Sequence, residues 1–403
     1  MIVSVYGIPR SGKDTFIKQV LQKRNNAVHI KGSEKLNELS KSLFGLKFRE
    51  LNNKQQKEIR IEFTRFVKGI NKEDCLIVVD GHYAFPNGNE FSSVFTDEDL
   101  DLYDVFFYLK RTPEEIVRNF NSDNKRDYSE YLLDVDKVQQ WMNFELSNMQ
   151  KVVESKEKDF IVLDSEPLTI DFVANFSKTS LQISKEIAKE IVELAGNKNV
   201  ILTDLDKTIS INDLTNDFIE KGELDSHRPK TIFKGDYYSW YQFYEFHSWL
   251  CSIENYEEAV LYSLSKLLIN EKLVRDIRAL KSDSVVVALT TGMADAWNKK
   301  NKELNLFDCL YGYSKNNNLV ITPLIKKLVA KYVTESIQTI GIGDSVIDLG
   351  MISQSNKGYL ISMTKLDKRI IAKMEDGFDF KSIQQPSYSE YKYDFIKEGN
   401  IKW

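Results

Sequence analysis

Two aspartates, Asp204 and Asp206, are separated by one residue and directly follow the short apolar run at 200–203. Two carboxylates at the end of a buried strand face a common opening, which suits phosphoryl transfer through an aspartyl-phosphate. One carboxylate attacks phosphorus, while the other donates a proton and then recovers it. An anionic phosphate must be neutralised before a carboxylate can attack it, so we expect a Mg²⁺ ion beside the pair.

Two later segments offer groups that suit the same chemistry. An apolar run at 338–342 is followed by a glycine and Asp344, and Asp348 lies four residues further on. Carboxylate oxygens at these positions can complete a Mg²⁺ shell. Between the two acidic motifs, the apolar run at 284–289 is followed by hydroxyls at 290–291, which can hold phosphate oxygens.

Together, these three motifs resemble the haloacid dehalogenase superfamily over about residues 199–380, and the Asp-x-Asp-Lys-Thr form at 204–208 is similar to its phosphoserine-phosphatase-like branch. The resemblance implies Asp204 as the nucleophile and Asp206 as the general acid/base. It implies that phosphate is bound by Thr208, Thr291 and Gly292, with Thr290 as the alternative to Thr291. It also implies a Mg²⁺ site formed by Asp204, Asp206, Asp344 and Asp348.

The family also uses a lysine to hold the phosphate, near the start of the helix that precedes the Gly-Asp strand. Thr322-Pro323 is the closest match to that helix start, and Lys326 and Lys327 follow a turn later. The spacing leaves both lysines open, and we take Lys326 as the catalytic one.

A long insert, from about 212 to 280, separates the first acidic motif from the hydroxyl-bearing strand end. In the superfamily that the sequence resembles, an insert at this point is a helical cap over the active site. A closing cap excludes water and polymers, so it favours small substrates. We interpret the aromatic stretch at 237–249 as the core of this cap rather than a base-stacking platform, because clustered aromatic side chains mostly pack together.

A second phosphate motif lies near the first residue, where the segment at 7–15 follows an apolar run at 2–6. Its glycines allow backbone N–H groups to surround phosphates, and its lysine adds positive charge. The usual pattern has Ser or Thr directly after the lysine, but here an aspartate intervenes, a shift that several nucleoside-monophosphate kinases share. The residues expected to bind ATP are Gly7, Arg10, Ser11, Gly12, Lys13, Asp14 and Thr15.

Further residues of this half suit a kinase. The apolar run at 76–79 ends in Asp80, which can organise Mg²⁺ and its waters. Arg111, Arg118 and Arg126 can clamp a transferring phosphoryl group, with a solvated helix face as the alternative. These features resemble the adenylate-kinase and related nucleotide-kinase group, most closely its archaeal-type enzymes, over about residues 1–178. The resemblance implies ATP and Mg²⁺ as cofactors.

Apolar runs alternate with helical patterns in both halves, which predicts α/β domains with parallel sheets. We expect a P-loop kinase-like domain at 1–178 and a linker helix at 179–198. A Rossmann-like haloacid dehalogenase domain follows at 199–383, with its helical cap at about 212–280, and a tail at 384–403 completes the chain.

Composition restricts the partners. The 403-residue chain has a formal net charge of -5, which argues against a general nucleic-acid binder. Its three cysteines, Cys75, Cys251 and Cys309, have no metal-ligand spacing and are interpreted as free thiols in a reducing compartment. No apolar run approaches the roughly 20 residues that a membrane-spanning helix needs. We therefore expect a cytoplasmic protein that acts without a membrane.

Three functions fit these patterns. The first is a bifunctional enzyme, in which a kinase for a nucleotide or similar small metabolite is joined to a Mg²⁺-dependent phosphatase. The second is a polynucleotide 5′-kinase and 3′-phosphatase that heals nucleic-acid ends, against which the acidic charge and the cap argue. The third is a nucleotide-sensing P-loop domain that regulates a phosphatase, because Asp14 beside the phosphate loop could weaken ATP binding.

Overall fold

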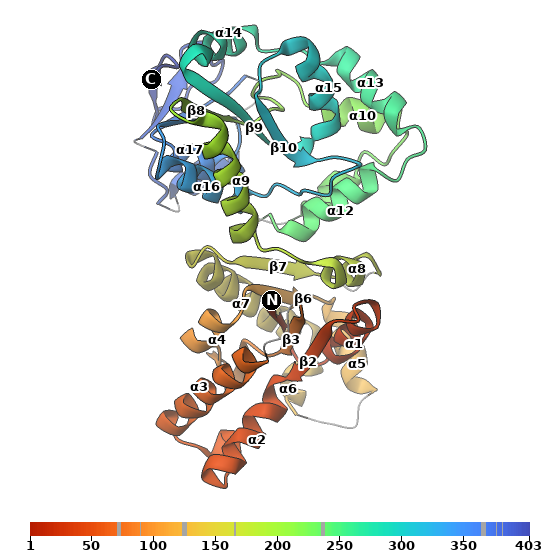
Figure 1. The fold of residues 1–403 in the computed structure, drawn as a ribbon. Helices are drawn as coiled ribbons and strands as arrows, with labels where there is room; N and C mark the ends of the chain where they lie inside the picture. The colour runs from red at the N-terminus through yellow and green to blue at the C-terminus, as the bar shows by residue number, and fades with distance from the viewer. Residues whose placement is uncertain are drawn as a thin grey trace. The chain divides into compact units, whose positions relative to one another are not determined.

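The computed structural model describes residues 1–70, 74–88, 90–122, 127–164, 167–234, 238–363, 368–375, 377–380 and 382–403. The chain divides into two compact units, Met1–Thr179 and Ser180–Trp403, each with its own parallel β-sheet surrounded by helices (Figure 1). The predicted α/β class with two parallel sheets is confirmed. Within the described part of the chain, no helix has both the length and the apolar character needed to cross a membrane.

The first unit has a five-stranded sheet in the order β2-β3-β1-β6-β7, and all its strand pairs are parallel. The strands are β1 (Ile2–Tyr6), β2 (Ala27–Lys31), β3 (Leu76–Asp80), β6 (Val105–Leu109) and β7 (Asp159–Leu163), and a separate hairpin joins β4 (Ala84–Asn87) to β5 (Glu90–Ser93). Strands buried on both faces read as continuous apolar runs, as β1, β3 and β6 do. The strand order reverses at β1, and open parallel sheets bind ligands at the carboxyl ends of strands beside such a reversal.

Helices cover both faces of this sheet. Phe106 and Tyr108 of β6 pack in one hydrophobic cluster with Trp141, while Phe107 between them contacts Phe172. The helices of the unit are α1 (Lys13–Lys23), α2 (Gly32–Phe44), α3 (Asn53–Gly69), α4 (Asp97–Leu102), α5 (Pro113–Asn121), α6 (Ser129–Leu132), α7 (Val135–Ser155) and α8 (Pro167–Asn175), with a 3₁₀ turn at Phe48–Glu50.

The second unit has a seven-stranded parallel sheet in the order β10-β9-β8-β11-β12-β13-β14. Its strands are β8 (Asn199–Thr203), β9 (Ser284–Met293), β10 (Cys309–Tyr313), β11 (Thr339–Gly343), β12 (Lys357–Leu360), β13 (Ile383–Pro386) and β14 (Lys397–Gly399). The order reverses at β8, which lies between β9 and β11. The carboxyl end of β8 is therefore the expected place for a ligand site.

The helices of the second unit form two groups. Those that flank the sheet or follow its strands are α9 (Ser180–Ala195), α14 (Glu271–Leu280), α15 (Ala294–Leu304), α16 (Pro323–Thr334), α17 (Leu349–Gln354) and α18 (Lys368–Glu375), with a 3₁₀ turn at Lys281–Asp283. Those of the insert after β8 are α10 (Leu214–Lys221), α11 (Arg228–Ile232), α12 (Trp240–Leu250) and α13 (Tyr256–Lys266). An antiparallel bridge between Ser210 and Ile269 joins the two ends of the insert.

Three expected boundaries differ from the structure. The helix expected as a linker, α9, packs Ile187 and Ile191 with Val329 of α16 in the second unit's core. Helix α14, expected within the cap, begins only after the bridge at Ile269 that closes the insert, so the insert ends earlier. The segment expected as a tail supplies β13 and β14 of the sheet. The physical reason is burial: the helices cover apolar side chains of the second unit, and the added strands pair with the edge of its sheet.

Candidate functional site

The carboxyl edge of the second sheet brings together acidic side chains that are far apart in the sequence. Asp204 follows β8 and Asp344 follows β11, and these neighbouring strands are parallel, with Thr203 paired to Ile342. One carboxylate oxygen each from Asp204, Asp344 and Asp348 lies within 4.8 Å of the other two. Three converging carboxylates form a set of hard oxygen donors, which fits Mg²⁺.

Lys326 lies among these carboxylates. Its side chain is fully buried, and Nζ lies 2.6 Å from Oδ1 of Asp204 and 2.6 Å from Oδ1 of Asp348. Thr322 begins α16 by accepting a hydrogen bond from the Ile325 backbone N–H at 3.2 Å, which fixes the helix start one turn earlier. Although burial opposes it, the two carboxylates raise the pKa of Lys326, so its ammonium group stays charged.

The turn after β11 is shaped around Asp348. Its Oδ2 accepts hydrogen bonds from the Ser345 hydroxyl at 2.9 Å and from the Ser345 and Asp344 backbone N–H groups at 3.2 and 3.3 Å. A Cβ at Gly343 would lie 2.3 Å from Cβ of Asp348, so only glycine fits there. The sequence analysis did not predict a role for Ser345, although its position directly after the Gly-Asp pair places it at the end of the strand, beside the predicted metal ligands.

Asp206 has a different environment from the three converging carboxylates and is not part of their group. Its oxygens accept hydrogen bonds from the Leu214 backbone N–H at 3.1 Å and from Trp297 Nε1 at 3.4 Å. Burial, with the nearby charges of Asp213 and Asp204, raises the pKa of Asp206 to about 8. A carboxyl group that is protonated at neutral pH can act as a general acid.

The three converging carboxylates repel one another. Burial raises the pKa of Asp204 to about 7 against the opposing charge of Lys326, and it raises the pKa of Asp344 well above its usual range, with Asp204 and Asp348 adding to the effect. When all three groups are ionised, their three negative charges face the single positive charge of Lys326. A divalent cation would supply the missing positive charge.

Hydroxyl groups complete this edge. The Thr208 hydroxyl lies 3.3 Å from Oδ2 of Asp204 and 3.4 Å from Oδ1 of Asp344. Thr290 is buried, and its Oγ1 accepts a hydrogen bond from the Gly292 N–H at 2.9 Å, whereas Thr291 is partly exposed. A Cβ at Gly292 would lie 2.5 Å from Oδ2 of Asp206, so this glycine permits close packing of the two motifs.

The insert also reaches this edge. His247 of α12 is buried and its Nε2 lies 3.0 Å from the Thr291 carbonyl oxygen, while its ring stacks on Tyr313 with centroids 4.4 Å apart. Burial lowers the pKa of His247 to about 3, so the ring is neutral and donates a hydrogen bond to the carbonyl. No motif in the sequence links this histidine to residue 291.

In the first unit, the segment after β1 forms the predicted loop at the start of α1. Gly7, Arg10 and Gly12 have positive φ angles of 148°, 71° and 84°, and a Cβ at Gly7 would lie 2.8 Å from the Leu109 carbonyl oxygen. The Ser11 hydroxyl is buried and has no hydrogen-bond partner among the described residues. Loop N–H groups and this hydroxyl can bind an anion.

Lys13 begins α1 and folds back over the loop. Its Nζ donates to the carbonyl oxygen of Gly7 at 2.5 Å and lies 3.3 Å from Nε2 of His82. Burial lowers the pKa of Lys13 to about 8. The lysine therefore lies at the loop, where its positive charge can bind a phosphate.

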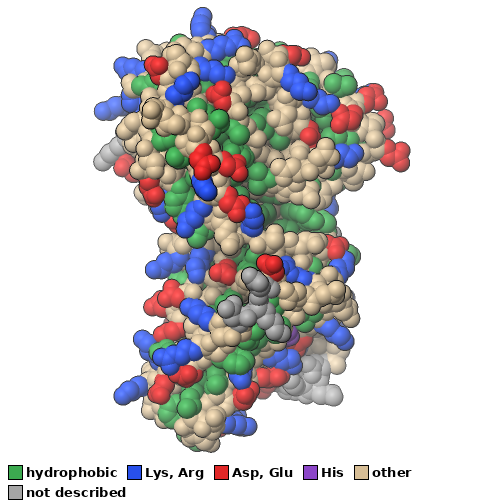
Figure 2. All heavy atoms as spheres, in the orientation of Figure 1, with side chains coloured by type: hydrophobic (Ala, Val, Ile, Leu, Met, Phe, Trp, Pro, Cys, Tyr) green, Lys and Arg blue, Asp and Glu red, His purple; other side chains and the backbone are tan. Residues whose placement is uncertain are grey.

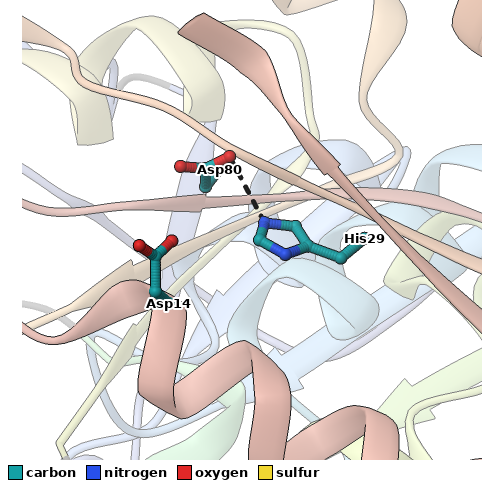
Figure 3. A group of neighbouring side chains, drawn as sticks. All are labelled: Asp14, His29 and Asp80. Atoms are coloured by element: carbon teal, nitrogen blue, oxygen red, sulfur yellow. Dashed lines mark hydrogen bonds and ion pairs between the residues drawn. The ribbon is translucent and has the colours of Figure 1, made fainter. Parts of the chain in front are cut away.

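Three polar side chains converge beside this loop (Figure 3). Asp14 projects from the first turn of α1 toward Asp80 at the end of β3, and His29 of β2 places Nε2 3.3 Å from Oδ1 of Asp80. One ligand atom from each of the three lies within 4.8 Å of the others. Sequence reasoning missed His29, because the register of β2 against β3 is not visible in the sequence.

The predicted arginines are not equally placed. Nε of Arg111 donates to the Ser11 carbonyl oxygen at 3.1 Å, so this arginine lies beside the phosphate loop. Arg118 is exposed on α5. Thr15, which was expected to bind ATP, is also exposed, on α1. Arg126 lies outside the described residues.

A cavity of about 1190 Å³ opens beside the carboxyl end of β3. Asp80 and His82 line it next to the loop, and α2, α3 and the turn between them supply much of its wall. Four basic side chains line it, Lys41, Lys47, Arg49 and Arg60, together with the aromatic side chains Tyr6, Phe48, Phe63, Phe85, Tyr103 and Tyr128.

Residues 6–135 match the family described as the AAA domain, which confirms the P-loop, kinase-like character of the first unit. A search of the curated proteins gave no match. Several solved structures are similar over parts of the chain. A substrate-bound phosphoserine phosphatase complex is 20% identical over 44% of this chain and 98% of its own, with a TM-score of 0.33.

Two further structures have different coverage. A shikimate kinase from Bacteroides thetaiotaomicron is 14% identical over 43% of this chain and 94% of its own, with a TM-score of 0.28. A chain of the Pnkp1/Rnl/Hen1 RNA repair complex is 13% identical over 87% of this chain and 91% of its own, with a TM-score of 0.24. These TM-scores are below 0.5, and the residues of the two sites carry the functional argument.

Proposed function

We propose that the second unit is a phosphomonoester hydrolase of the haloacid dehalogenase type that acts through an aspartyl-phosphate. One observation carries this proposal: buried Lys326 lies 2.6 Å from both Asp204 and Asp348, with Asp344 in the same group of carboxylates. The arrangement holds a nucleophilic carboxylate, a fixed positive charge and a set of oxygen donors at one strand edge.

The reaction follows from these positions. Lys326 holds Oδ1 of Asp204, which leaves Oδ2 to attack phosphorus, and the Thr208 hydroxyl helps to orient that oxygen. Protonated Asp206 donates to the leaving oxygen, and its carboxylate then takes a proton from the water that hydrolyses the aspartyl-phosphate. A Mg²⁺ ion held by Asp204, Asp344 and Asp348 would neutralise the charge of the phosphate.

For the first unit, we propose an ATP-dependent phosphotransferase, which makes the chain bifunctional. The loop with Lys13 and the unpartnered Ser11 hydroxyl binds the ATP phosphates, and Arg111 lies beside it. The cavity next to Asp80 and His82 is the acceptor site in this proposal. Its aromatic and basic side chains suit a nucleotide or a similar small phosphorylated metabolite.

A polynucleotide end is the second candidate for the acceptor. The size of the cavity and its basic side chains Lys41, Lys47 and Arg49 favour this candidate, because such groups can bind a phosphate backbone, although four acidic side chains also line the cavity. The acidic net charge argues against it. On the face shown in Figure 2, described acidic and basic side chains are interspersed over both units rather than forming a basic stripe.

One panel experiment tests the phosphatase and its substrate. Phosphate release with Mg²⁺ is measured from nucleoside monophosphates, phosphoserine, sugar phosphates and a 3′-phosphorylated oligonucleotide. Turnover of a small metabolite, lost in Asp204→Asn but kept in the exposed control Asp283→Asn, supports the leading proposal. Turnover of the oligonucleotide alone would establish the second candidate, and no turnover of any substrate would refute the phosphatase.

Transfer of the terminal phosphate of ATP tests the kinase. The acceptors are nucleosides, nucleotides and a 5′-hydroxyl oligonucleotide, and Lys13→Met is compared with Lys18→Met, which changes an exposed lysine of the same helix. Transfer lost only in Lys13→Met supports the proposal. ATP binding without transfer to any acceptor would instead favour the nucleotide-sensing reading.

A further inference from the structure

We propose that Asp14, Asp80 and His29 bind a divalent transition-metal ion, with an imidazole nitrogen as one ligand, whether or not a nucleotide is present. The three side chains come from α1, β3 and β2, and Figure 3 shows that they face a common point. This inference concerns the same loop as the proposed kinase activity, but the binding itself requires no phosphoryl transfer.

Asp14 gives the first reason. It occupies the position directly after the loop lysine, where the usual phosphate-loop pattern has a hydroxyl that binds Mg²⁺. A hydroxyl is a weak neutral ligand that depends on phosphate oxygens to complete the shell. A carboxylate brings its own negative charge, so it binds a cation more strongly without the nucleotide.

Asp80 gives the second reason, because it is already held in place. Its Oδ1 accepts a hydrogen bond from the Gly32 backbone N–H at 3.0 Å, and a Cβ at Gly32 would lie 2.6 Å from the Asp80 carbonyl oxygen. The carboxylate is therefore already held in position by these neighbours.

The separation of the three ligand atoms also fits the ligand spacing around a single octahedral metal ion. Ligand atoms on opposite sides of an octahedral ion with bonds of about 2.1 Å lie roughly 4.2 Å apart. The three atoms here lie within 4.8 Å of one another, so shifts below about 1 Å bring them into range. Asp14 is exposed and free of the core, so its side chain can make that shift.

His29 decides the class of metal. Mg²⁺ strongly prefers oxygen ligands, whereas imidazole suits Fe²⁺, Ni²⁺, Cu²⁺ and Zn²⁺ and is also accepted by Mn²⁺ beside carboxylates. Binding uses the neutral imidazole, with its proton on Nδ1 and the lone pair of Nε2 directed at the metal. The 3.3 Å contact between Nε2 and Asp80 is then replaced by two bonds to one ion.

Mn²⁺ is a suitable probe, because pulsed electron paramagnetic resonance detects a directly bound ¹⁴N nucleus. The full chain is stripped with a chelator and loaded with Mn²⁺ in the absence of nucleotide. The proposed phosphatase site offers only carboxylate oxygens in its ligand group, so a ¹⁴N coupling reports the first unit. We expect that coupling in the wild type and expect it to survive a molar excess of Mg²⁺.

Two variants show which histidine gives the ¹⁴N coupling. His29→Gln should abolish the ¹⁴N coupling and lower Mn²⁺ affinity at this site at least about tenfold. His82→Gln, which changes a histidine at the same sheet edge, should retain both. Circular dichroism establishes that each variant is folded. Coupling that persists in His29→Gln, disappears in His82→Gln or is lost to excess Mg²⁺ would overturn the proposal.

The outcome is separable from that of the kinase proposal. Phosphoryl transfer with Mg²⁺ and ATP, but no ¹⁴N coupling, would leave the kinase standing and refute the transition-metal site. A ¹⁴N coupling that depends on His29, without transfer to any acceptor, would establish the metal site and refute the kinase.

Discussion

Lys326 is the residue on which the charge balance of the second unit depends. It lies between Asp204 and Asp348 at 2.6 Å from each, and all three side chains are buried. Removing one partner of a buried ion group leaves uncompensated charge, which costs about 3–5 kcal/mol. The lysine therefore has a structural role as well as the proposed role in binding phosphate.

Lys326→Met tests both roles. We expect loss of phosphatase activity and a decrease of about 3–5 kcal/mol in the free energy of unfolding without divalent cations. Urea unfolding with and without Mg²⁺ measures this, and Mg²⁺ should recover part of the stability by neutralising the carboxylates. The matched control, Lys327→Met on the same helix, should keep activity; equal losses in both variants would contradict the assignment of Lys326.

Asp206→Asn separates proton transfer from nucleophilic attack. A general acid contributes about 10²- to 10⁴-fold, so kcat should decrease by that amount for an alkyl phosphate with a poor leaving group. A nitrophenyl phosphate needs little proton donation, so formation of the aspartyl-phosphate from it should decrease much less in single-turnover kinetics. Equal losses for both substrates would mean that Asp206 is not the general acid.

Glu145 predicts a pH-dependent stability of the first unit. It is fully buried and bonds the Ala84 N–H and the Tyr108 hydroxyl, and burial raises its pKa from 4.5 to about 7. The folded state therefore keeps a proton that the unfolded state releases. Stability is greatest below about pH 4.5 and falls as pH rises to about 7, by about 3 kcal/mol in total.

Glu145→Gln should remove this dependence, because the amide resembles the protonated acid. Hydrogen exchange of β6 and α7 amides measures the stability of the first unit. We expect the variant to exceed the wild type at pH 8 and to match it near pH 5. Wild-type and variant profiles that run parallel between these pH values would show that Glu145 is not the titrating group.

At the scale of single residues, spacing in the sequence predicted Asp204, Asp344, Asp348 and Lys326 as site residues, and the structure brings these four together. Each follows a predicted strand or helix start, and parallel strands bring their carboxyl ends to one edge. His29 and Trp297 were not predicted, because neither lies in a motif. Their positions depend on strand register and helix packing, which a single sequence does not reveal.

At the scale of elements, α12 connects the insert to the strand end that carries the hydroxyls of Thr290 and Thr291, which we predict to bind phosphate. The connection is the hydrogen bond from His247 to the Thr291 carbonyl oxygen, supported by stacking on Tyr313. His247→Phe keeps the stacking and removes the hydrogen bond, a loss of about 1 kcal/mol. KM for phosphatase substrates should rise about fivefold, with a smaller change in kcat.

The effect of His247→Phe should also be the same from pH 5 to 8, since burial lowers the pKa of His247 to about 3 and the ring is neutral throughout. Steady-state kinetics across this range measure both features. A ratio of variant to wild-type KM that changes near pH 6.5 would contradict the neutral donor.

The positions of the helices and strands were predicted better than the domain to which each of them belongs. Apolar runs gave the central strands of both sheets, because buried parallel strands have a continuous apolar sequence. Helices α9 and α14 were assigned to a linker and a cap, since an amphipathic pattern shows that a helix has a buried face without showing what covers it. Strands β13 and β14 are short and polar, so no periodicity marked them.

At the scale of the whole molecule, each unit has a buried sheet and its own group of proposed catalytic side chains. The loop with Lys13 belongs to Met1–Thr179, and the Asp204 site, including α9 and the last two strands, belongs to Ser180–Trp403. Each domain with its own core can in principle fold alone. We therefore predict that the two activities can be removed separately.

Lys13→Met should abolish phosphoryl transfer from ATP and leave phosphatase activity within about twofold, and Asp204→Asn should do the reverse.

Residues 1–179 and 180–403, expressed as separate chains, should each keep one activity. A further fragment that begins at 199 should be poorly folded, because it lacks α9 and exposes Val200, Leu202 and Val329 of the core. Activity and thermal unfolding of the three fragments measure these outcomes. Loss of phosphatase activity in Lys13→Met, or in the intact 180–403 fragment, would show that the first unit controls the second and would favour nucleotide sensing over a two-activity enzyme.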